Sequence, residues 1–283
     1  PKYGYYYCLT LEKYLKSQSA STTLPIINKS SFSEISLPLP PLAEQKRIAA
    51  ILDKADAIHR KRQQAIQLAD DFLRSVFLDM FGDPVTNPKG WEESTLEQIA
   101  HKITDGEHLN PEFSSTGMPL VMASNVLERG IDFLNIKYVE ENLGRKFRKK
   151  CNAEYNDLLI VSRGATIGRQ CIVKTEIDFC LMGSVILVKP KSKLIKTRFL
   201  SALLAFKGFR DRLYKTSGSS AQQAIYLKDL KNLRCLVPPP ALQDNFIKVA
   251  DKLDGFLEAV SGVGRVNENL FNSLSQKAFS GQL

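Results

Sequence analysis

The chain contains the stretch Pro40-Pro41-Leu42-Ala43-Glu44-Gln45, and a close copy, Pro238-Pro239-Pro240-Ala241-Leu242-Gln243, stands 198 positions later. The match extends upstream at the same offset, where residues 1–37 correspond to residues 199–235. Two unrelated Pro-rich loops would not keep one offset over roughly 80 positions, so we interpret the two stretches as an internal repeat. The repeat predicts the tail of one domain, a helix, a whole domain and a second helix.

Each copy continues into a long amphipathic helix. Pro41 and Pro240 stand at the expected helix starts, and Gly82 and Gly281 follow the expected last turns, positions that suit these residue types. Apolar residues follow alternating steps of three and four, as in the seam of a coiled coil. The seam positions are Ile48, Leu52, Ala55, Ile66, Ala69, Leu73, Val76 and Met80, and then Val249, Leu253, Phe256, Val260, Val263, Leu270 and Leu274. We expect the two helices to pack antiparallel and to act as a spacer.

The repeat divides the chain into four segments. We expect a C-terminal remnant of a first globular domain at 1–37, helical regions at 38–83 and 237–283, and a globular domain at 84–236. Nothing in the chain is a copy of roughly 92–198, so most of the first domain is expected to be missing. The apolar residues of the remnant should then be poorly ordered or covered by another copy of the chain.

The composition predicts a cytoplasmic globular protein. The chain is 43% hydrophobic and 24% charged, which is enough to bury a substantial core. It has no apolar run long enough to cross a membrane. Its five cysteines have no C-x-x-C spacing and no neighbouring histidines, so we expect reduced core cysteines and no metal site.

The positive charge is concentrated in the central domain. Residues 92–236 carry 23 Lys and Arg against 16 Asp and Glu. One basic cluster is Arg145-Lys146-Phe147-Arg148-Lys149-Lys150, and a second spreads over residues 189–215. Charge runs are commonly only solvated surface, but two clusters in one domain favour a polyanionic partner.

The central domain is expected to be α/β or α+β with short strands. Strands are predicted at residues 121–123, 158–161, 170–173 and 184–188. A tight connection is predicted at 162–169, and helical spacing of apolar residues runs from 199 to 214. The predicted fold class is therefore α+β, joined to two long antiparallel helices.

Four motifs carry a resemblance to a known family. They are Pro40-Pro41-Leu42-Ala43-Glu44-Gln45-Lys46-Arg47-Ile48, Phe81-Gly82-Asp83-Pro84-Val85-Thr86-Asn87-Pro88-Lys89-Gly90-Trp91, Ser162-Arg163-Gly164-Ala165-Thr166-Ile167-Gly168 and Ser217-Gly218-Ser219-Ser220-Ala221-Gln222-Gln223. Their combination resembles the specificity subunits of type I restriction–modification enzymes, over essentially the whole chain. The chain departs from the pattern of two target recognition domains, which puts recognition of two half-sites by one copy in doubt.

The resemblance implies a non-catalytic subunit that binds double-stranded DNA. It implies one target recognition domain at 84–236 that reads half of a bipartite site, and helices that dock modification (methyltransferase) subunits. S-adenosylmethionine, ATP and Mg²⁺ would be bound by the modification and restriction subunits, and no cofactor by this chain. Self-association through the helices and the 1–37 remnant is also possible.

Elementary chemistry assigns roles to particular side chains. Glutamine amides suit adenine edges and arginines suit guanine N7 and O6, while hydroxyls and lysines suit phosphates. Asp105-Gly106-Glu107-His108 is interpreted either as a polar turn that faces a groove or, equally well, as an ordinary surface turn. The candidate DNA-binding residues are Asp105, His108, Lys146, Arg148, Lys149, Arg163, Thr166, Arg169, Lys196, Arg198, Arg210, Ser217, Ser219, Gln222 and Gln223.

Two other classes of protein compete with this interpretation. An adenine methyltransferase needs an Asn/Asp-Pro-Pro-aromatic motif, and Asn110-Pro111-Glu112-Phe113 has Glu at its third position, with no glycine-rich cofactor loop. A DNA-binding or coiled-coil adaptor outside any restriction complex would explain the helices. A pure adaptor would leave the basic domain without a role.

Overall fold

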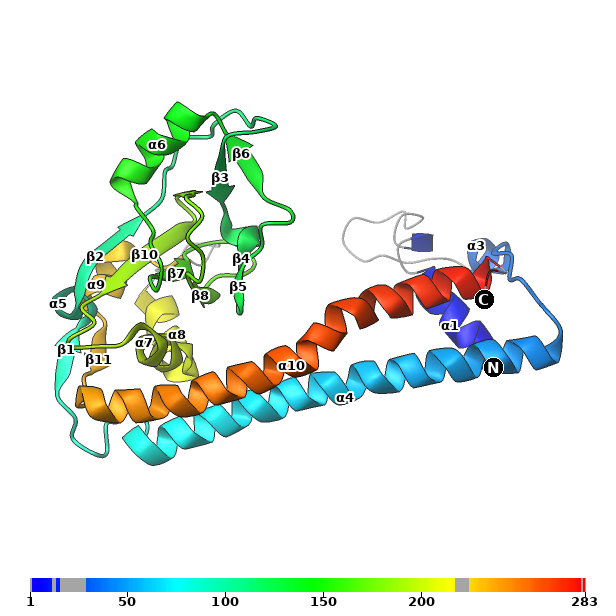
Figure 1. Ribbon diagram of the computed structural model, residues 1–283, viewed down its shortest axis with the longest axis horizontal. Coiled ribbons are helices and arrows are strands. Elements are labelled where there is room, and N and C mark those ends of the chain that lie inside the picture. The colour runs from blue at the N-terminus through cyan, green and yellow to red at the C-terminus, as the bar shows by residue number, and fades with distance from the viewer. Residues whose placement is uncertain (1, 12–13, 16–28, 217–223, 281, 283) are drawn as a thin grey trace. The chain divides into compact units, whose positions relative to one another are not determined.

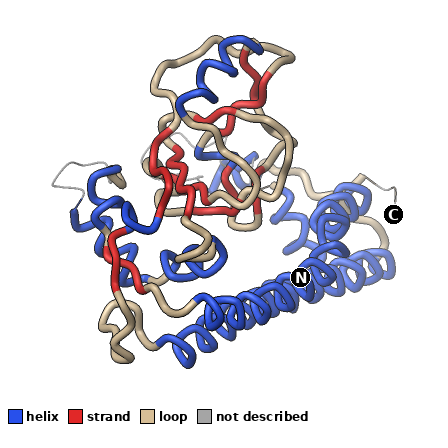
Figure 2. Tube along the Cα trace, turned by 60° about the vertical axis from the view of Figure 1, so that its left-hand side comes forward, coloured by secondary structure: helices blue, strands red, loops and turns tan. Residues whose placement is uncertain are grey.

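The computed structural model describes residues 2–11, 14–15, 29–216, 224–280 and 282. The chain divides into two compact units (Figure 1). Unit 1 comprises Pro1–Phe72 and Lys252–Leu283, and unit 2 comprises Leu73–Asp251. In the described parts every strand lies in unit 2 (Figure 2). The finer four-segment division drawn from the sequence stays a prediction.

The sequence repeat is also a repeat of structure. Helix α4 spans Leu42–Phe81 and helix α10 spans Pro240–Phe279, 40 residues each, so both ends of α10 lie at the repeat offset from those of α4. Helices α3 (Lys29–Ser33) and α9 (Leu227–Asn232) also begin at corresponding positions. Over the described residues, no helix combines the length and apolar character that crossing a membrane requires.

Unit 1 contains helix α1 (Lys2–Thr10) packed on the first part of α4 and the last part of α10. Tyr6 is buried in a cluster with Ile48 and Ala278, and its hydroxyl donates to the Asp53 carboxylate at 2.7 Å. Ile48 lies near the start of α4 and Ala278 near the end of α10, so the two helices run antiparallel here. Coverage of the remaining apolar residues by another copy stays a prediction.

The seam of α10 differs from the expected one. Phe256, a predicted seam residue, is 57% exposed, whereas its neighbour Leu257 is 6% exposed. Phe246 and Ala250 are fully buried on the same face as Leu257. The prediction was wrong at Phe256, since the buried stripe passes at this point through Leu257, one residue further along the helix. The side chains of Val260, Val263 and Leu270 lie outside the described residues.

Unit 2 is built around a four-stranded antiparallel sheet of order β2-β10-β7-β8. Its strands are β2 (Ala100–Asp105), β7 (Leu158–Val161), β8 (Gln170–Ile172) and β10 (Val185–Pro190). Strands β7, β8 and β10 coincide with or overlap segments predicted as strands. Residues 185–188 of β10 are buried on both faces of the sheet, which is why this strand is a continuous apolar run.

Smaller elements surround this sheet. A three-stranded sheet has the order β6-β3-β9, and two pairs of strands, β4 with β5 and β1 with β11, are antiparallel. The strands are β1 (Glu93–Thr95), β3 (Met118–Val121), β4 (Val126–Leu127), β5 (Gly130–Ile131), β6 (Lys137–Val139), β9 (Cys180–Leu181) and β11 (Arg234–Leu236). The helices are α5 (Leu96–Ile99), a 3-10 turn at Ala123–Asn125, α6 (Glu141–Lys150), α7 (Thr197–Ala205) and α8 (Lys207–Thr216). The α+β class with long antiparallel helices is confirmed.

Two segments depart from the predicted elements. The strand expected at 121–123 keeps only Val121, because the 3-10 turn begins at Ala123. The helix expected over 199–214 is two helices, since the backbone is extended at Phe206. A side chain at Gly208 would overlap Val85, with 2.3 Å between its Cβ and the Val85 Cγ2, so glycine lets α8 approach the segment after α4.

Aromatic rings join both long helices to the domain within unit 2. Phe77 and Phe81 of α4, Phe199 of α7 and Phe246 of α10 are all at most 1% exposed. Phe77 stacks on Phe199 with ring centroids 5.5 Å apart, and Phe81 meets Phe199 edge to face at 4.9 Å. Such pairs contribute about 0.5–1.5 kcal/mol beyond the area they bury. The helix ends are therefore part of the domain core.

A buried glutamine holds the start of α10. The Gln243 amide donates to the carbonyl oxygens of Pro238 and Leu194 at 2.7 and 2.9 Å and accepts from the Lys196 amide at 2.8 Å. Its repeat counterpart Gln45 donates to Pro40 at 2.8 Å and is only half-buried. The bond to the residue five positions earlier is common to both copies.

We predict that Gln243→Leu lowers the free energy of unfolding of unit 2 by about 2–4 kcal/mol, because three backbone groups lose a buried partner. Trp91, the one tryptophan of the chain, lies in unit 2 and reports its unfolding in urea by fluorescence. The matched control Gln45→Leu should leave this transition nearly unchanged. Equal losses from both variants would contradict the assignment.

Candidate nucleic-acid interface

The antiparallel sheet brings the ends of its strands to one edge. Asp105 at the end of β2 pairs with Ile186, and Val161 at the end of β7 pairs with Val185 at the start of β10. Gln170, at the start of β8, pairs with Ile160. The segments that follow β2 and β7 and that precede β10 and β8 therefore leave the sheet together.

Main-chain hydrogen bonds tie these segments to one another. The Gly183 amide donates to the Glu107 carbonyl at 2.6 Å, and the Ser162 amide donates to the Ser184 carbonyl at 2.8 Å. The Ser162 carbonyl accepts from the Ile225 amide at 2.7 Å. We call this set of segments, residues 105–108, 162–169, 182–184 and 224–225, the loop edge. It unites two of the predicted DNA-reading segments.

The third predicted segment, residues 217–223, is followed in the chain by Ala224, which belongs to the loop edge. Arg163 forms an antiparallel bridge with Ala224, the residue after the polar stretch. Ser217, Ser219, Gln222 and Gln223 themselves lie outside the described residues.

The turn at Asp105–His108 is held rigidly. The His108 Nε2 lies 2.6 Å from the Asp105 carboxylate, and the Lys150 ammonium donates to the Gly106 carbonyl at 3.1 Å. A side chain at Gly106 would overlap the Leu181 carbonyl, with 2.2 Å between Cβ and oxygen. The His108 side chain is about half exposed, at 49%. The turn therefore presents its histidine from a fixed backbone.

The connection between β7 and β8 is a compact loop with polar side chains on the surface. Gly164 and Gly168 have positive φ angles of 95° and 77°, which glycine adopts at little cost. Arg163 is exposed, Thr166 is half-buried, and Arg169 donates to the Val126 carbonyl of β4 at 3.5 Å. Arg163 is thus the arginine of this loop that faces solvent more fully.

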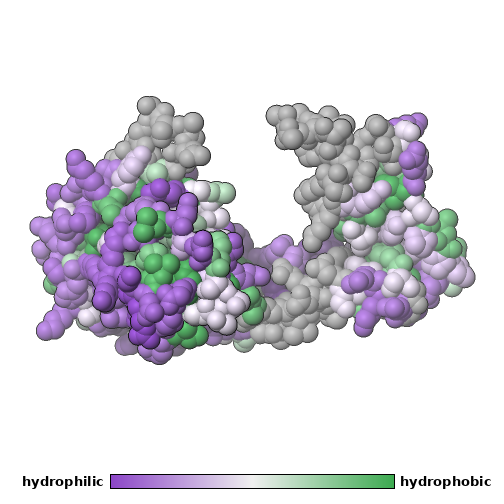
Figure 3. Space-filling view, turned by 90° about the horizontal axis from the view of Figure 1, so that it is seen from above, coloured by the Kyte–Doolittle hydropathy of each residue, from purple (hydrophilic) through white to green (hydrophobic). Residues whose placement is uncertain are grey.

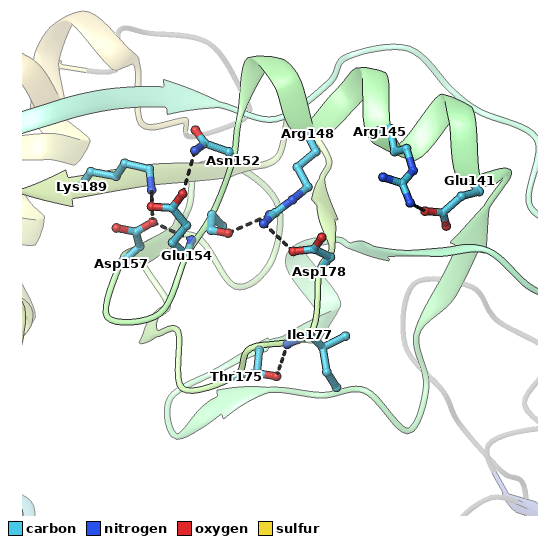
Figure 4. Close-up of polar contacts among 11 residues, drawn as sticks. Glu141, Arg145, Arg148, Asn152, Glu154, Asp157, Thr175, Ile177, Asp178 and Lys189 are labelled. Atoms are coloured by element: carbon cyan, nitrogen blue, oxygen red, sulfur yellow. Dashed lines mark hydrogen bonds and ion pairs between the residues drawn. The ribbon is translucent and has the colours of Figure 1, made fainter.

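The basic residues of α6 fall into two kinds (Figure 4). Lys146 and Lys149 are exposed. Arg148 instead bonds the Ala153 carbonyl at 2.8 Å and pairs with Asp178 at 2.5 Å, and its side chain is 22% exposed. Its guanidinium is therefore engaged in holding the segment after α6, and the two lysines are better placed to meet phosphates.

The second basic cluster does not form one continuous surface. Lys189 pairs with Asp157 at 2.7 Å and Glu154 at 2.8 Å, and its side chain is 14% exposed (Figure 4). Desolvation is the largest single influence on the pKa of the Lys189 ammonium and lowers it. The hydrogen bonds and charges of Asp157 and Glu154 together outweigh it, so the pKa is raised above its ordinary value. Burial raises the pKa of Asp157 more than its partners lower it. The contact between these two residues is internal to the fold.

The remaining predicted cations lie on α7, directly before it, and on α8, and Figure 1 draws these helices at the other end of unit 2 from α6. Lys196 pairs with Asp244 of α10 at 3.8 Å and is half-buried. Arg198 is half-buried at the start of α7, and Arg210 is exposed on α8. On the viewed face of unit 2, hydrophilic side chains surround smaller hydrophobic areas (Figure 3). The two basic clusters belong to different surfaces.

Four of the five cysteines lie in the core as predicted, whereas Cys8 is free and exposed, so the prediction was wrong for that residue. Cys151, Cys171, Cys180 and Cys235 are free and buried, and burial raises the pKa of each thiol to about 12. Phe113 is 52% exposed, with the Lys137 ammonium 4.1 Å above its ring. Over the described ranges no group of three His, Cys, Asp or Glu side chains could hold a metal ion.

Sequence reasoning missed the segment Met182-Gly183-Ser184, which contacts two of the predicted loops. It carries no charge and no motif, and it lies at the start of a predicted strand. Its role depends on the pairing of β10 with β2 and β7, which is long-range in the sequence. The one local signal is Gly183, since a Cβ there would lie 2.4 Å from the His108 Nδ1.

The profile of the type I restriction modification DNA specificity domain matches residues 1–68 and 88–261. The chain is 24% identical over 307 residues to the type I restriction enzyme EcoBI specificity subunit of Escherichia coli, covering 95% of the chain and 63% of that protein. It is 26% identical over 259 residues to the MjaVIII specificity subunit of Methanocaldococcus jannaschii, covering 84% of the chain and 60% of that protein. The chain thus spans less than two thirds of the length of these relatives.

The fold is similar to that of a solved type I restriction-modification S subunit from M. genitalium. The TM-score is 0.57 at 20% sequence identity, and the match covers 98% of this chain and 72% of that one. At this level of identity the likeness concerns the arrangement of the backbone.

We predict that Arg148→Ala lowers the free energy of unfolding of unit 2 by about 1–3 kcal/mol, because the Ala153 carbonyl and Asp178 lose their partner. Arg145→Ala is the control, since Arg145 is 67% exposed and its ion pair among the described residues is with Glu141 one turn away. It should change stability by about 0.5 kcal/mol or less. Urea unfolding of both variants measures the difference, and a larger loss from Arg145→Ala would be evidence against it.

We predict an acid-sensitive contribution from Glu140, the N-cap of α6. Its carboxylate accepts from the Asn142 and Leu143 amides, each at 3.0 Å, and these bonds lower its pKa. A lowered pKa in the folded state stabilises the protein above the unfolded pKa, and this stabilisation disappears as the pH falls through the folded pKa. The difference in unfolding free energy between wild type and Glu140→Gln should therefore shrink as the pH is lowered from about 7 to about 3. A gap that stays constant over this range would rule out a role for the charge.

Proposed function

This chain belongs to the family of type I restriction modification DNA specificity domains, and we propose that it selects the DNA sequence on which a type I restriction–modification complex acts. In this proposal unit 2 binds double-stranded DNA and recognises part of the target site. The chain itself has no catalytic role. Modification subunits, which would bind S-adenosylmethionine, and a restriction subunit, which would use ATP and Mg²⁺, supply the chemistry.

The observation that carries the proposal is the loop edge. Two segments chosen from the sequence for their base-reading side chains, residues 105–108 and 162–169, come from distant parts of the chain and meet at one edge of one sheet. They are held through main-chain bonds to Gly183 and Ser184, which leaves the exposed side chains of His108 and Arg163 able to meet a ligand. A groove of DNA is a ligand that several short loops can read together, because each base pair presents its own pattern of donors and acceptors.

The roles of individual residues follow from their chemistry and exposure. Arg163 is proposed to contact guanine, with Arg169, Gln222 and Gln223 reading neighbouring bases. Lys146, Lys149 and Arg210 are exposed, and we propose that they contact phosphates. Hydroxyls at Ser217 and Ser219 would do the same. Arg148 is proposed as a structural residue, because its guanidinium is occupied by Asp178 and Ala153.

The helices are proposed to dock the modification subunits. Each of the two helices has 40 residues, about 60 Å at 1.5 Å per residue, much longer than the domain core requires. In this proposal residues 38–83 and 237–283 are the docking regions and residues 84–236 the recognition domain. Self-association through residues 1–37 is a further possibility for the assembled protein, and the proposed location is the cytoplasm.

The experiment is a comparison of two variants in the complex with modification subunits, after the methylated motif has been mapped in cellular DNA. Lys149→Ala should weaken binding to motif and random DNA alike and reduce the salt slope of log K by about 0.9. Arg163→Ala should cost about 1–3 kcal/mol on the motif and little on random DNA. A complex that methylates no motif and prefers no sequence would refute the proposal and favour an adaptor.

A further inference from the structure

His108 differs from the other candidate reading residues because the structure settles which of its nitrogens meets a protein partner. Its Nε2 lies 2.6 Å from the Asp105 carboxylate oxygen. A carboxylate only accepts hydrogen bonds, so in the neutral ring the proton is on Nε2. The other nitrogen, Nδ1, is then a hydrogen-bond acceptor. This tautomer is assigned from the hydrogen-bond partner.

Gly183 lets the His108 ring lie against the backbone of the loop edge. A Cβ at residue 183 would lie 2.4 Å from Nδ1 and 2.6 Å from Cε1 of His108. Any other residue would therefore displace the ring. The Gly183 amide donates to the Glu107 carbonyl at 2.6 Å, so the glycine cannot move away without breaking the loop edge. Across the described residues no hydrogen bond to the His108 Nδ1 is seen.

The position of His108 agrees with a role in reading. It is exposed by about half and stands in the loop edge next to Ser162, whose hydroxyl donates to the Gly183 carbonyl at 3.4 Å. The neighbouring candidates Arg163 and Arg169 are donors, which suit the acceptor atoms of guanine. An acceptor beside them suits the opposite pattern. In the major groove, exocyclic amino donors belong to adenine N6 and cytosine N4.

We propose that His108 recognises an amino-bearing base, adenine or cytosine, through Nδ1, and that Asp105 and Gly183 are the positioning residues that fix the ring and leave Nδ1 as its acceptor. The inference rests on the proposed function and adds to it the direction of one hydrogen bond, in which the base donates and His108 accepts. It distinguishes His108 from a residue that contacts phosphate, which would need to donate.

The test is a cycle of protein and base changes in the complex with modification subunits. Each adenine of the mapped motif is replaced in turn by purine, and each cytosine by an analogue lacking the 4-amino group. At one position the loss of the amino group should weaken binding by about 10-fold in the wild type and by less than about 2-fold in His108→Ala. Gly183→Ala should behave like His108→Ala, and His101→Ala, an exposed histidine at the other end of β2, like wild type.

The outcomes separate the inference from the proposed function. If the wild-type complex has a motif but His108→Ala remains sensitive to every amino group, the inference is wrong and the proposed function stands. The inference is also overturned if His108→Ala weakens binding to motif and random DNA equally. It is overturned as well if the substitution whose effect depends on His108 is the replacement of a guanine by 7-deazaguanine. Circular dichroism and Trp91 fluorescence identify a variant that fails to fold. In that event His108→Ala, a surface change, decides the outcome without Gly183→Ala.

Discussion

The register of strand β10 is the constraint on which the rest of unit 2 depends. Its residues 185–188 are buried on both faces, and it pairs with β2 on one side and β7 on the other. A shift of one residue would turn every side chain of the strand to the opposite face. Because both neighbours are antiparallel to β10, this one register places Asp105, Val161 and Val185 at a common edge. The candidate reading segments are neighbours for that reason.

Much of this arrangement could be predicted from the sequence, and the limits have physical causes. The repeat predicted both long helices and the offset between them, because it compares the chain with itself and needs no knowledge of packing. Their seam was misplaced at Phe256, since alternating spacing does not decide which of two adjacent apolar residues, Phe256 or Leu257, faces inward. The break at Phe206 was missed because the apolar spacing continues across it, from Phe199 and Leu203 to Phe209 and Leu213.

The candidate site shows the same division between local and long-range information. Residue type suggested His108, Arg163 and Lys149, and the structure leaves all three accessible. Residue type also suggested Arg148, whose occupation by Asp178 depends on a contact 30 positions away in the chain. Gly183 was missed because its importance comes from a neighbour in space. Local patterns can indicate what a side chain can do, and only packing decides whether it is free to do it.

The segments of the loop edge are joined to one another by main-chain hydrogen bonds, to which the exposed side chain of Arg163 does not contribute. Exchange of an outward-facing residue there therefore leaves the anchoring bonds in place, except at Gly106 and Gly183, where any side chain would collide with a neighbour. If the edge reads bases as proposed, altered base preference and loss of folding are separate events at such positions. A new preference would then need one substitution and no matching repair of the core.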